Sequence, residues 1–107
     1  MRSILTICVV ALVSLAANAE AQEQAAKVAA GKKATQHQCS SCHDVSGKSP
    51  PSHPPGGAPA FLEVAQSSDW TAHKLRQFLR FPHGRMVNLL LTGSEADSAV
   101  AYILSLR

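Results

Sequence analysis

The amino-acid sequence predicts an all-α fold of about four helices. Apolar residues recur at helical spacing, at i, i+3 and i+4, in four separate segments. No alternating strand pattern and no internal repeat lies between these segments. The chain has 107 residues, and residues 20–107 remain once a leader is set aside, which suits a single small domain. A domain of this size buries a modest core and commonly depends on a cofactor or a cross-link.

The first 19 residues have the pattern of a signal peptide. A short positive start, Met1-Arg2, precedes a run of apolar and small residues over 4–17. Ala17-Asn18-Ala19 matches an A-x-A cleavage pattern, and a second candidate site lies at residues 19–21. The apolar run is shorter than the roughly 20 residues that a membrane-spanning helix needs. We therefore expect a signal peptide over 1–19, with cleavage after 21 as the alternative, and no stable membrane insertion afterwards.

The first helix of the mature domain is predicted over residues 22–38, where the helix formers Ala, Gln and Lys dominate. Gly31 lies inside this segment at a cost of up to about 1 kcal/mol relative to Ala. A glycine in that position is typical of a close approach by another backbone, and Tyr102 of the last helix is the expected partner. A slim apolar stripe is predicted from alanines at i, i+4: Ala26, Ala30 and Ala34.

Residues 44–59 are predicted to form a loop, because five of the six prolines lie there together with three glycines. A short helix is predicted over about 60–65. The next helix, over 71–81, has Thr71 or Asp69 as its N-cap and is expected to end at Pro82. Its predicted apolar face consists of Ala72, Leu75, Phe78 and Leu79.

The last helix is predicted to begin at Thr92-Gly93-Ser94-Glu95, which is a capping-box pattern. Its apolar face continues through to Leu106. The predicted members of this face are Ala96, Ala99, Val100, Ile103 and Leu104.

Cys39-Ser40-Ser41-Cys42-His43 is the attachment pattern of a c-type haem. Two thiols separated by two residues can reach the two vinyl groups on one edge of a porphyrin and form thioether bonds. The histidine that follows is then carried under the iron, where an imidazole nitrogen can ligate it. The pattern therefore predicts one covalent haem c and its iron.

A zinc site and a thioredoxin-like redox pair are the alternatives for the same residues. A structural zinc site normally needs four protein ligands, and the chain has no second cysteine pair. A redox pair is expected within a βαβ pattern, which does not flank this segment. The third cysteine, Cys8, lies in the predicted leader, so the mature chain keeps two thiols, and one haem uses both.

The second axial position of the iron has several candidates. Met86 is the only methionine after removal of the leader, and a thioether in a loop after Pro82 can reach over a haem. A methionine that fills a gap in the core is the alternative reading. His83 in the same loop is the main rival, and an open site for water or a gas is also consistent. The remaining histidines are weaker candidates: His37, His53 and His73.

These residues resemble the small class I cytochrome c family over residues 25–106. The resemblance rests on Gly31, the haem motif, Met86 and a last helix that contains Glu95, Asp97 and Tyr102. It implies a cytochrome c fold in which the first and last helices cross at Gly31 and Tyr102. The sequence departs from the family at Thr35, where an aromatic residue is common, and at Val87, where a proline is common.

The resemblance also implies the haem-binding residues. Cys39 and Cys42 would hold the haem, and His43 and Met86 would ligate the iron. The His43 ring N–H would donate to the Pro59 carbonyl, and Phe61 would lie on the ring.

A six-coordinate iron with His and Met ligands suits a one-electron carrier rather than an enzyme. We expect a periplasmic monomer that meets a redox donor and an acceptor through transient contacts. The alternatives are a haem enzyme or a gas-binding module with an open or His-ligated sixth site, or the electron-transfer subunit of a larger oxidoreductase. The net charge of +3 falls to +2 when Arg2 leaves with the leader, which argues against nucleic-acid binding.

Overall fold

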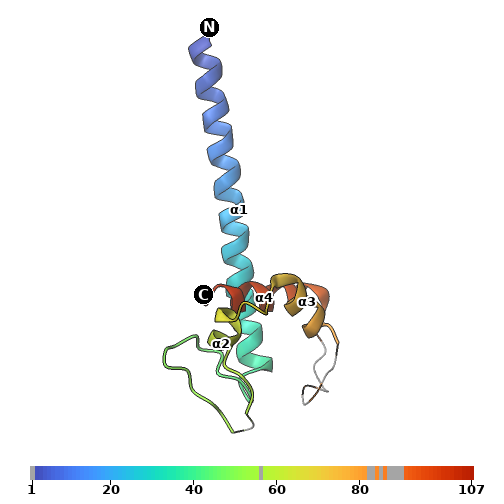
Figure 1. The fold of residues 1–107 in the computed structure, drawn as a ribbon. Coiled ribbons are helices and arrows are strands. Elements are labelled where there is room, and N and C mark those ends of the chain that lie inside the picture. The colour runs from blue at the N-terminus through green and yellow to red at the C-terminus, as the bar shows by residue number, and fades with distance from the viewer. Residues whose placement is uncertain (1, 56, 82–83, 85, 87–90) are drawn as a thin grey trace.

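The computed structural model describes residues 2–55, 57–81, 84, 86 and 91–107, with side chains from residue 12 onward. The described residues form four helices and no strand, and the helices follow one another along the chain (Figure 1). The all-α prediction and the predicted number of helices are confirmed. The helices are α1 (Arg2–Gln38), α2 (Phe61–Gln66), α3 (Ala72–Leu79) and α4 (Gly93–Leu104).

Helix α1 begins at Arg2, not near residue 22 as predicted, and continues unbroken through both candidate cleavage sites. The reason is local, because no proline or glycine interrupts the chain before Gly31 and helix formers lie on both sides of the sites. Its N-terminal part projects away from the other helices (Figure 1), and residues 12–27 are exposed. No helix in the described part of the chain is long and apolar enough to span a membrane.

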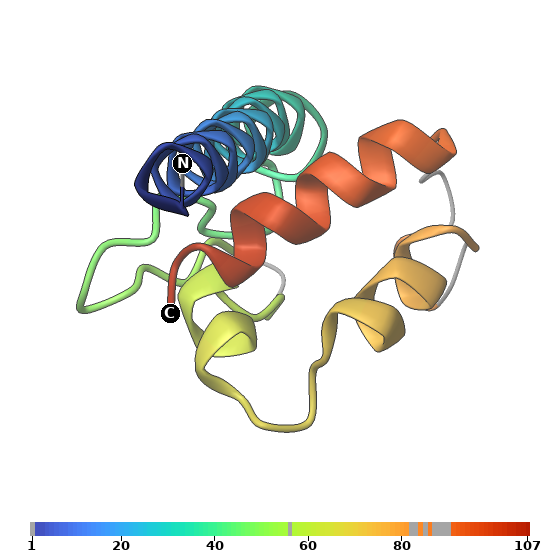
Figure 2. The same ribbon diagram turned by 90° about the horizontal axis from the view of Figure 1, so that it is seen from above.

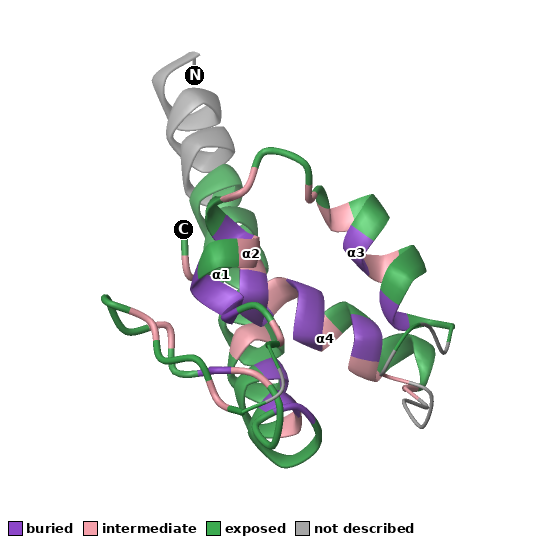
Figure 3. Ribbon diagram, turned by 60° about the horizontal axis from the view of Figure 1, so that its bottom comes forward, coloured by how far each residue is buried: buried purple, intermediate pink, exposed green. Residues whose placement is uncertain are grey.

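Helix α4 is the centre of the packing, since α1, α2 and α3 each pack against it. Viewed along α1, α4 crosses that helix on one side and faces α2 and α3 on the other (Figure 2). Buried residues therefore recur along α4 (Figure 3). They are Ala96, Ala99, Val100, Tyr102 and Ile103.

The crossing of α1 and α4 occurs at Gly31, as predicted. A Cβ atom at Gly31 would lie 1.9 Å from the Ser98 carbonyl oxygen and 2.9 Å from the Tyr102 Cβ. Both distances are shorter than a van der Waals contact, so the two backbones can approach this closely only where residue 31 has no side chain. The absence of the Gly31 side chain thus sets the distance between the two helices.

The predicted alanine stripe on α1 is wrong at Ala26 and Ala30, which are exposed, whereas Ala34 is half-buried. The buried positions are Gly31, Thr35 and Cys39, spaced by four residues. Since α4 crosses α1 and does not run along it, only the turns near the crossing are covered. Thr35 is 1 % exposed, and its hydroxyl donates to the Lys32 carbonyl 3.1 Å away, so this polar side chain is satisfied within its own helix.

Local capping signals fix the starts of the shorter helices. The Thr71 hydroxyl accepts from the Lys74 N–H at 3.2 Å, which settles the choice between Thr71 and Asp69 as N-cap of α3. The Thr92 hydroxyl accepts from the Glu95 N–H at 3.3 Å and the Glu95 carboxylate accepts from the Thr92 N–H at 2.8 Å, so the predicted capping box is present.

Two helix ends differ from the prediction by two residues. Helix α3 ends at Leu79 with Arg80 as its C-cap, and Pro82, the expected stop, lies outside the described residues. Helix α4 ends at Leu104, because the Ser105 hydroxyl donates to the Tyr102 carbonyl at 2.6 Å and occupies a helical acceptor.

Candidate functional site

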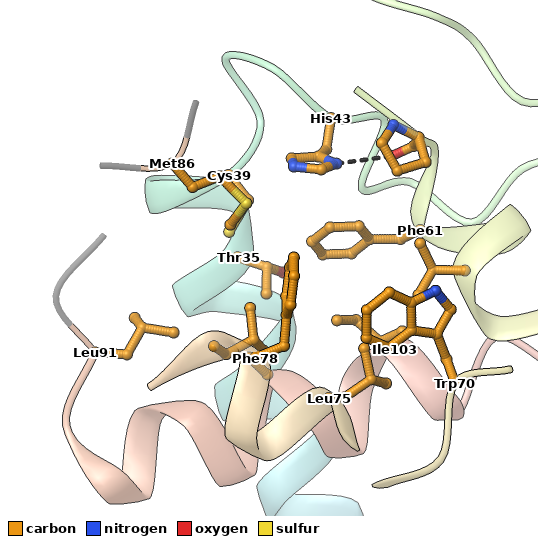
Figure 4. Close-up of a pocket in the computed structure, with 14 residues that line it drawn as sticks. Thr35, Cys39, His43, Phe61, Trp70, Leu75, Phe78, Met86, Leu91 and Ile103 are labelled. Atoms are coloured by element: carbon orange, nitrogen blue, oxygen red, sulfur yellow. Dashed lines mark hydrogen bonds between the residues drawn. The ribbon is translucent and has the colours of Figure 1, made fainter. Parts of the chain in front are cut away.

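An apolar cavity lies between the C-terminal end of α1 and helices α2, α3 and α4 (Figure 4). Its volume is about 150 Å³, and its wall is almost entirely apolar. Its described wall holds few polar groups: the Thr35 hydroxyl, the His43 imidazole, the Trp70 indole N–H and the Cys39 thiol. The lining residues are Thr35, Cys39, His43, Pro59, Phe61, Val64, Trp70, Leu75, Phe78, Leu79, Met86, Leu91, Ala99 and Ile103.

The Cys-x-x-Cys-His segment continues directly from the end of α1. The Cys39 N–H donates to the Thr35 carbonyl at 2.9 Å, and the Cys39 carbonyl accepts from the N–H groups of Cys42 and His43 at 3.1 and 2.9 Å. This turn keeps both cysteines and His43 close to one another. The three residues of the pattern are thus held together at the end of α1.

The two thiols have different surroundings. Cys39 is 9 % exposed and lines the cavity, and its burial raises the pKa of the thiol to about 11. Cys42 is exposed and does not belong to the described lining of the cavity. Its sulfur accepts a weak hydrogen bond from the Ser41 hydroxyl at 3.7 Å. Cys39 therefore faces the interior of the cavity, whereas Cys42 lies on the solvent side.

His43 lies at the cavity wall with its Nδ1 atom 2.7 Å from the Pro59 carbonyl oxygen (Figure 4). A carbonyl oxygen can only accept, so Nδ1 is the protonated nitrogen. The Nε2 atom of the neutral ring then keeps its lone pair, which is the form that ligates a metal. The Phe61 ring lies beside it, with ring centroids 5.3 Å apart and planes inclined by 49°. The structure thus places Pro59 and Phe61 against His43, and their roles toward a haem stay predictions.

Met86 also lines the cavity and is half-buried. His83, its main rival, lies outside the described residues, as do Arg85 and Val87. The other candidate histidines are exposed and do not line the cavity: His37, His53 and His73. Among the described candidates for the second axial position, Met86 is the one that the fold brings to the cavity.

Trp70 was not anticipated as a site residue. It lines the cavity and makes an edge-to-face contact with Phe78, with centroids 5.0 Å apart and planes inclined by 65°. The Arg107 guanidinium donates to the carbonyls of Trp70 at 2.9 Å and Ala65 at 2.8 Å and so anchors the segment before α3. The only available signal was that Trp70 is the single tryptophan of the chain. Phe78 was predicted to lie on a packed helix face, but it borders the cavity and is 39 % exposed.

The residues of the cavity fit a haem c. A porphyrin presents a large apolar surface, which matches a wall formed almost entirely by aliphatic and aromatic side chains. Thiol, imidazole and thioether groups, which are the groups that attach and ligate a c-type haem, all occur at this site.

Comparison with known proteins agrees with this fit. The model of the cytochrome c family matches residues 28–107. Cytochrome c-552 of Bradyrhizobium diazoefficiens is 34 % identical over 99 residues, which cover 92 % of each chain. No solved structure matches the chain. The cavity, the Cys-x-x-Cys-His turn and these two matches agree on one conclusion: the chain belongs to the cytochrome c family of electron-transfer proteins, whose cofactor is a covalently bound haem c with its iron.

Proposed function

We propose that the mature chain is a periplasmic one-electron carrier in which Cys39 and Cys42 bind one haem and His43 and Met86 ligate its iron. The observation that supports this most directly is the geometry of His43. Its Nδ1 atom donates to Pro59, its Nε2 atom is available, and Met86 lines the same apolar cavity.

When bound, the haem supplies an iron centre that cycles between the ferric and ferrous states. The chain's own residues set the conditions for this cycle. Pro59 holds the His43 ring in one tautomer and orientation. The apolar wall would exclude water from a bound metal, and a Met86 thioether would occupy the position that a substrate or a gas would need. Ligands that stay in place in both oxidation states favour electron transfer over catalysis.

The leader and the redox contacts belong to the same proposal. Residues 1–19 would direct export and be removed, and the family match begins only at residue 28. A monomeric carrier of this size would meet its donor and its acceptor through small, transient interfaces, typically below about 1,200 Å².

Two measurements on the purified holoprotein test the proposal. Intact mass under denaturing conditions should give one haem added to a chain that begins near Glu20 or Gln22. The ferric protein should show the near-infrared charge-transfer band of sulfur ligation. A mass equal to the bare polypeptide, after expression with the haem-attachment machinery, would contradict covalent binding. Absence of the band together with rapid cyanide binding would favour a sensor or an enzyme with an open site.

A further inference from the structure

Asp44 follows the proposed ligand His43 and is the one buried carboxylate in the described part of the chain, at 9 % exposed. Its Oδ1 atom accepts from the Ser46 N–H at 2.9 Å, and its Oδ2 atom accepts from the Ser52 N–H at 2.7 Å. Its main-chain carbonyl accepts from the Phe61 N–H at 2.9 Å. One residue thus holds the beginning, the middle and the end of the 44–60 loop.

The loop has few other ways to hold its shape. Five of its residues are prolines, which have no N–H to donate. Asp44 accepts from two of the loop's remaining amide groups. A third, that of Lys48, donates to the Ser46 hydroxyl at 3.2 Å. At the far end of the loop, the Glu63 carboxylate accepts from the Ala60 N–H at 2.9 Å. From outside the loop, the Glu63 carboxylate also lies 3.6 Å from His53 Nε2, and the Tyr102 hydroxyl donates to the Val45 carbonyl. The Asp44 side chain is the one that accepts from two amide groups inside the described part of the loop.

The bond between the Asp44 carbonyl and the Phe61 N–H aligns the two ends of the loop. Pro59 lies two residues before Phe61, and His43 lies one residue before Asp44. The alignment of Asp44 with Phe61 therefore brings the Pro59 carbonyl to the Nδ1 atom of His43. We propose that Asp44 is a positioning residue, whose buried carboxylate clamps the 44–60 loop so that Pro59 stays hydrogen-bonded to His43. The inference rests on the proposed role of His43 as an iron ligand.

The clamp has a chemical consequence at the metal. Donation from Nδ1 to a carbonyl makes an imidazole ligand more basic, and a more basic ligand stabilises ferric iron. When the clamp is weakened, the His43 to Pro59 bond opens more often. The Nδ1 proton then exchanges faster with water, and the reduction potential moves to a higher value.

Asp44→Asn in the holoprotein tests this directly. The amide replaces one accepting oxygen by a donor, which faces the N–H of Ser46 or Ser52 without a partner. In NMR of the ferrous protein we expect the His43 Nδ1 proton to exchange at least about tenfold faster, equivalent to about 1.4 kcal/mol in the opening equilibrium. The potential should rise at the same time. Asp69→Asn is the matched control, because it removes the same charge from an exposed residue and should change neither reading.

Ser52→Pro separates the clamp from the charge. This variant keeps the Asp44 carboxylate and removes one of its two donors, so it should accelerate exchange and raise the potential in the same direction by a smaller amount. If Asp44→Asn yields no holoprotein, Ser52→Pro alone tests whether the clamp holds the His43 to Pro59 hydrogen bond. If the variants fold with the spectrum of the wild type and their Nδ1 proton exchanges at the wild-type rate, the proposal is overturned. A higher reduction potential of Asp44→Asn would not rescue it, because the carboxylate would then act only through its charge. A wild-type protein without the His–Met spectrum would instead contradict the proposed function.

Discussion

The Nδ1 atom of His43 donates a hydrogen bond, and its Nε2 atom keeps a free lone pair. This tautomer is set by a single carbonyl oxygen. Pro59 accepts from Nδ1 at 2.7 Å, and Phe61 packs beside the ring. A ring held on two sides cannot turn away from the cavity when the iron changes charge. The proposed proximal ligand is thus held by local contacts. The proposed distal ligand, Met86, is half-buried and lines the cavity, as does Leu91 among the described residues after α3.

Met86→Ala tests the distal side. Loss of the thioether should convert the ferric haem toward high spin and open it to cyanide or carbon monoxide, because no other described side chain of the cavity wall is placed to replace the sulfur. Optical and paramagnetic resonance spectra measure the change. His73→Ala, on the exposed face of α3, is the control and should leave the spectra unaltered. His83→Ala should also be silent. If it opens the iron while Met86→Ala does not, the protein is a bis-histidine carrier.

At the scale of elements, α4 organises the domain, and its two ends are secured in different ways. The Thr92 and Glu95 capping box begins the helix, and hydrogen bonding from Thr92 holds the pKa of the Glu95 carboxyl below its usual range. Near the other end, burial and then the nearby Asp44 carboxylate raise the pKa of Tyr102, whose hydroxyl donates to the Val45 carbonyl. This bond ties the last helix to the segment that follows the haem motif.

Gly31→Ala should disrupt the crossing of α1 and α4. A methyl group 1.9 Å from a carbonyl oxygen cannot be accommodated unless the helices separate, so we expect a loss of about 3 kcal/mol or more in the free energy of unfolding, despite the better helix propensity of alanine. Denaturant unfolding of the holoprotein measures it. Gly93→Ala is the matched control, since a Cβ there meets no atom within 4 Å, and it should change stability by less than about 1 kcal/mol. Equal effects of the two variants would contradict the crossing.

Glu95→Gln should make the free energy of unfolding less dependent on pH in the acidic range. The folded pKa of Glu95 is depressed, so its contribution is fully present above the ordinary glutamate pKa of about 4.3 and is lost as the pH falls through the folded value. The variant should be less stable than wild type at pH 7, and the difference should shrink below about pH 4. Denaturant melts at several pH values measure it. A difference that stays constant down to pH 2 would show that the carboxylate does not act through its charge.

Structural features that depend on residues close together in the sequence could be predicted. Features that depend on packing between distant segments could not. The Thr92 cap, the proline loop and the close approach at Gly31 each follow from a few residues. The stripe on α1 was misplaced because the burial of Thr35 depends on the angle at which α4 crosses. Asp44 and Trp70 were missed because their roles depend on partners such as Ser52 and Arg107, which the fold brings near. The positions of His83 and Val87 lie outside the described residues.

At the scale of the whole molecule, the cavity lies between the four helices, the position that core side chains occupy in a larger domain. α1 and α3 do not pack on one another directly but meet through α4 and the cavity wall. The 44–60 loop is largely exposed and is held by a few polar contacts. The haem would therefore provide the apolar surface that these segments lack among themselves.

A chain that has not received its haem should accordingly be largely disordered. Residues 20–107 with His43→Ala, or made without the attachment machinery, should show little helical circular dichroism and no cooperative melt, because the apolar lining would have only solvent to face. The holoprotein measured in parallel is the reference. A cooperative transition of the apoprotein near the holoprotein midpoint would show that the four helices stabilise each other without the cofactor.

The crossing at Gly31 also orders events in time. Synthesis delivers α1 first, yet the surface that closes over Gly31 consists of Ser98 and Tyr102, which belong to the last of the four helices, α4. Until those residues emerge, the first helix has no partner, and no native core can close behind it. If Cys39 and Cys42 bind the haem as proposed, an attachment enzyme would meet them while the chain is still open and both sulfurs can be reached. Burial of Cys39 follows only when α4 has packed, so the fold itself delays closure of the site until α4 arrives.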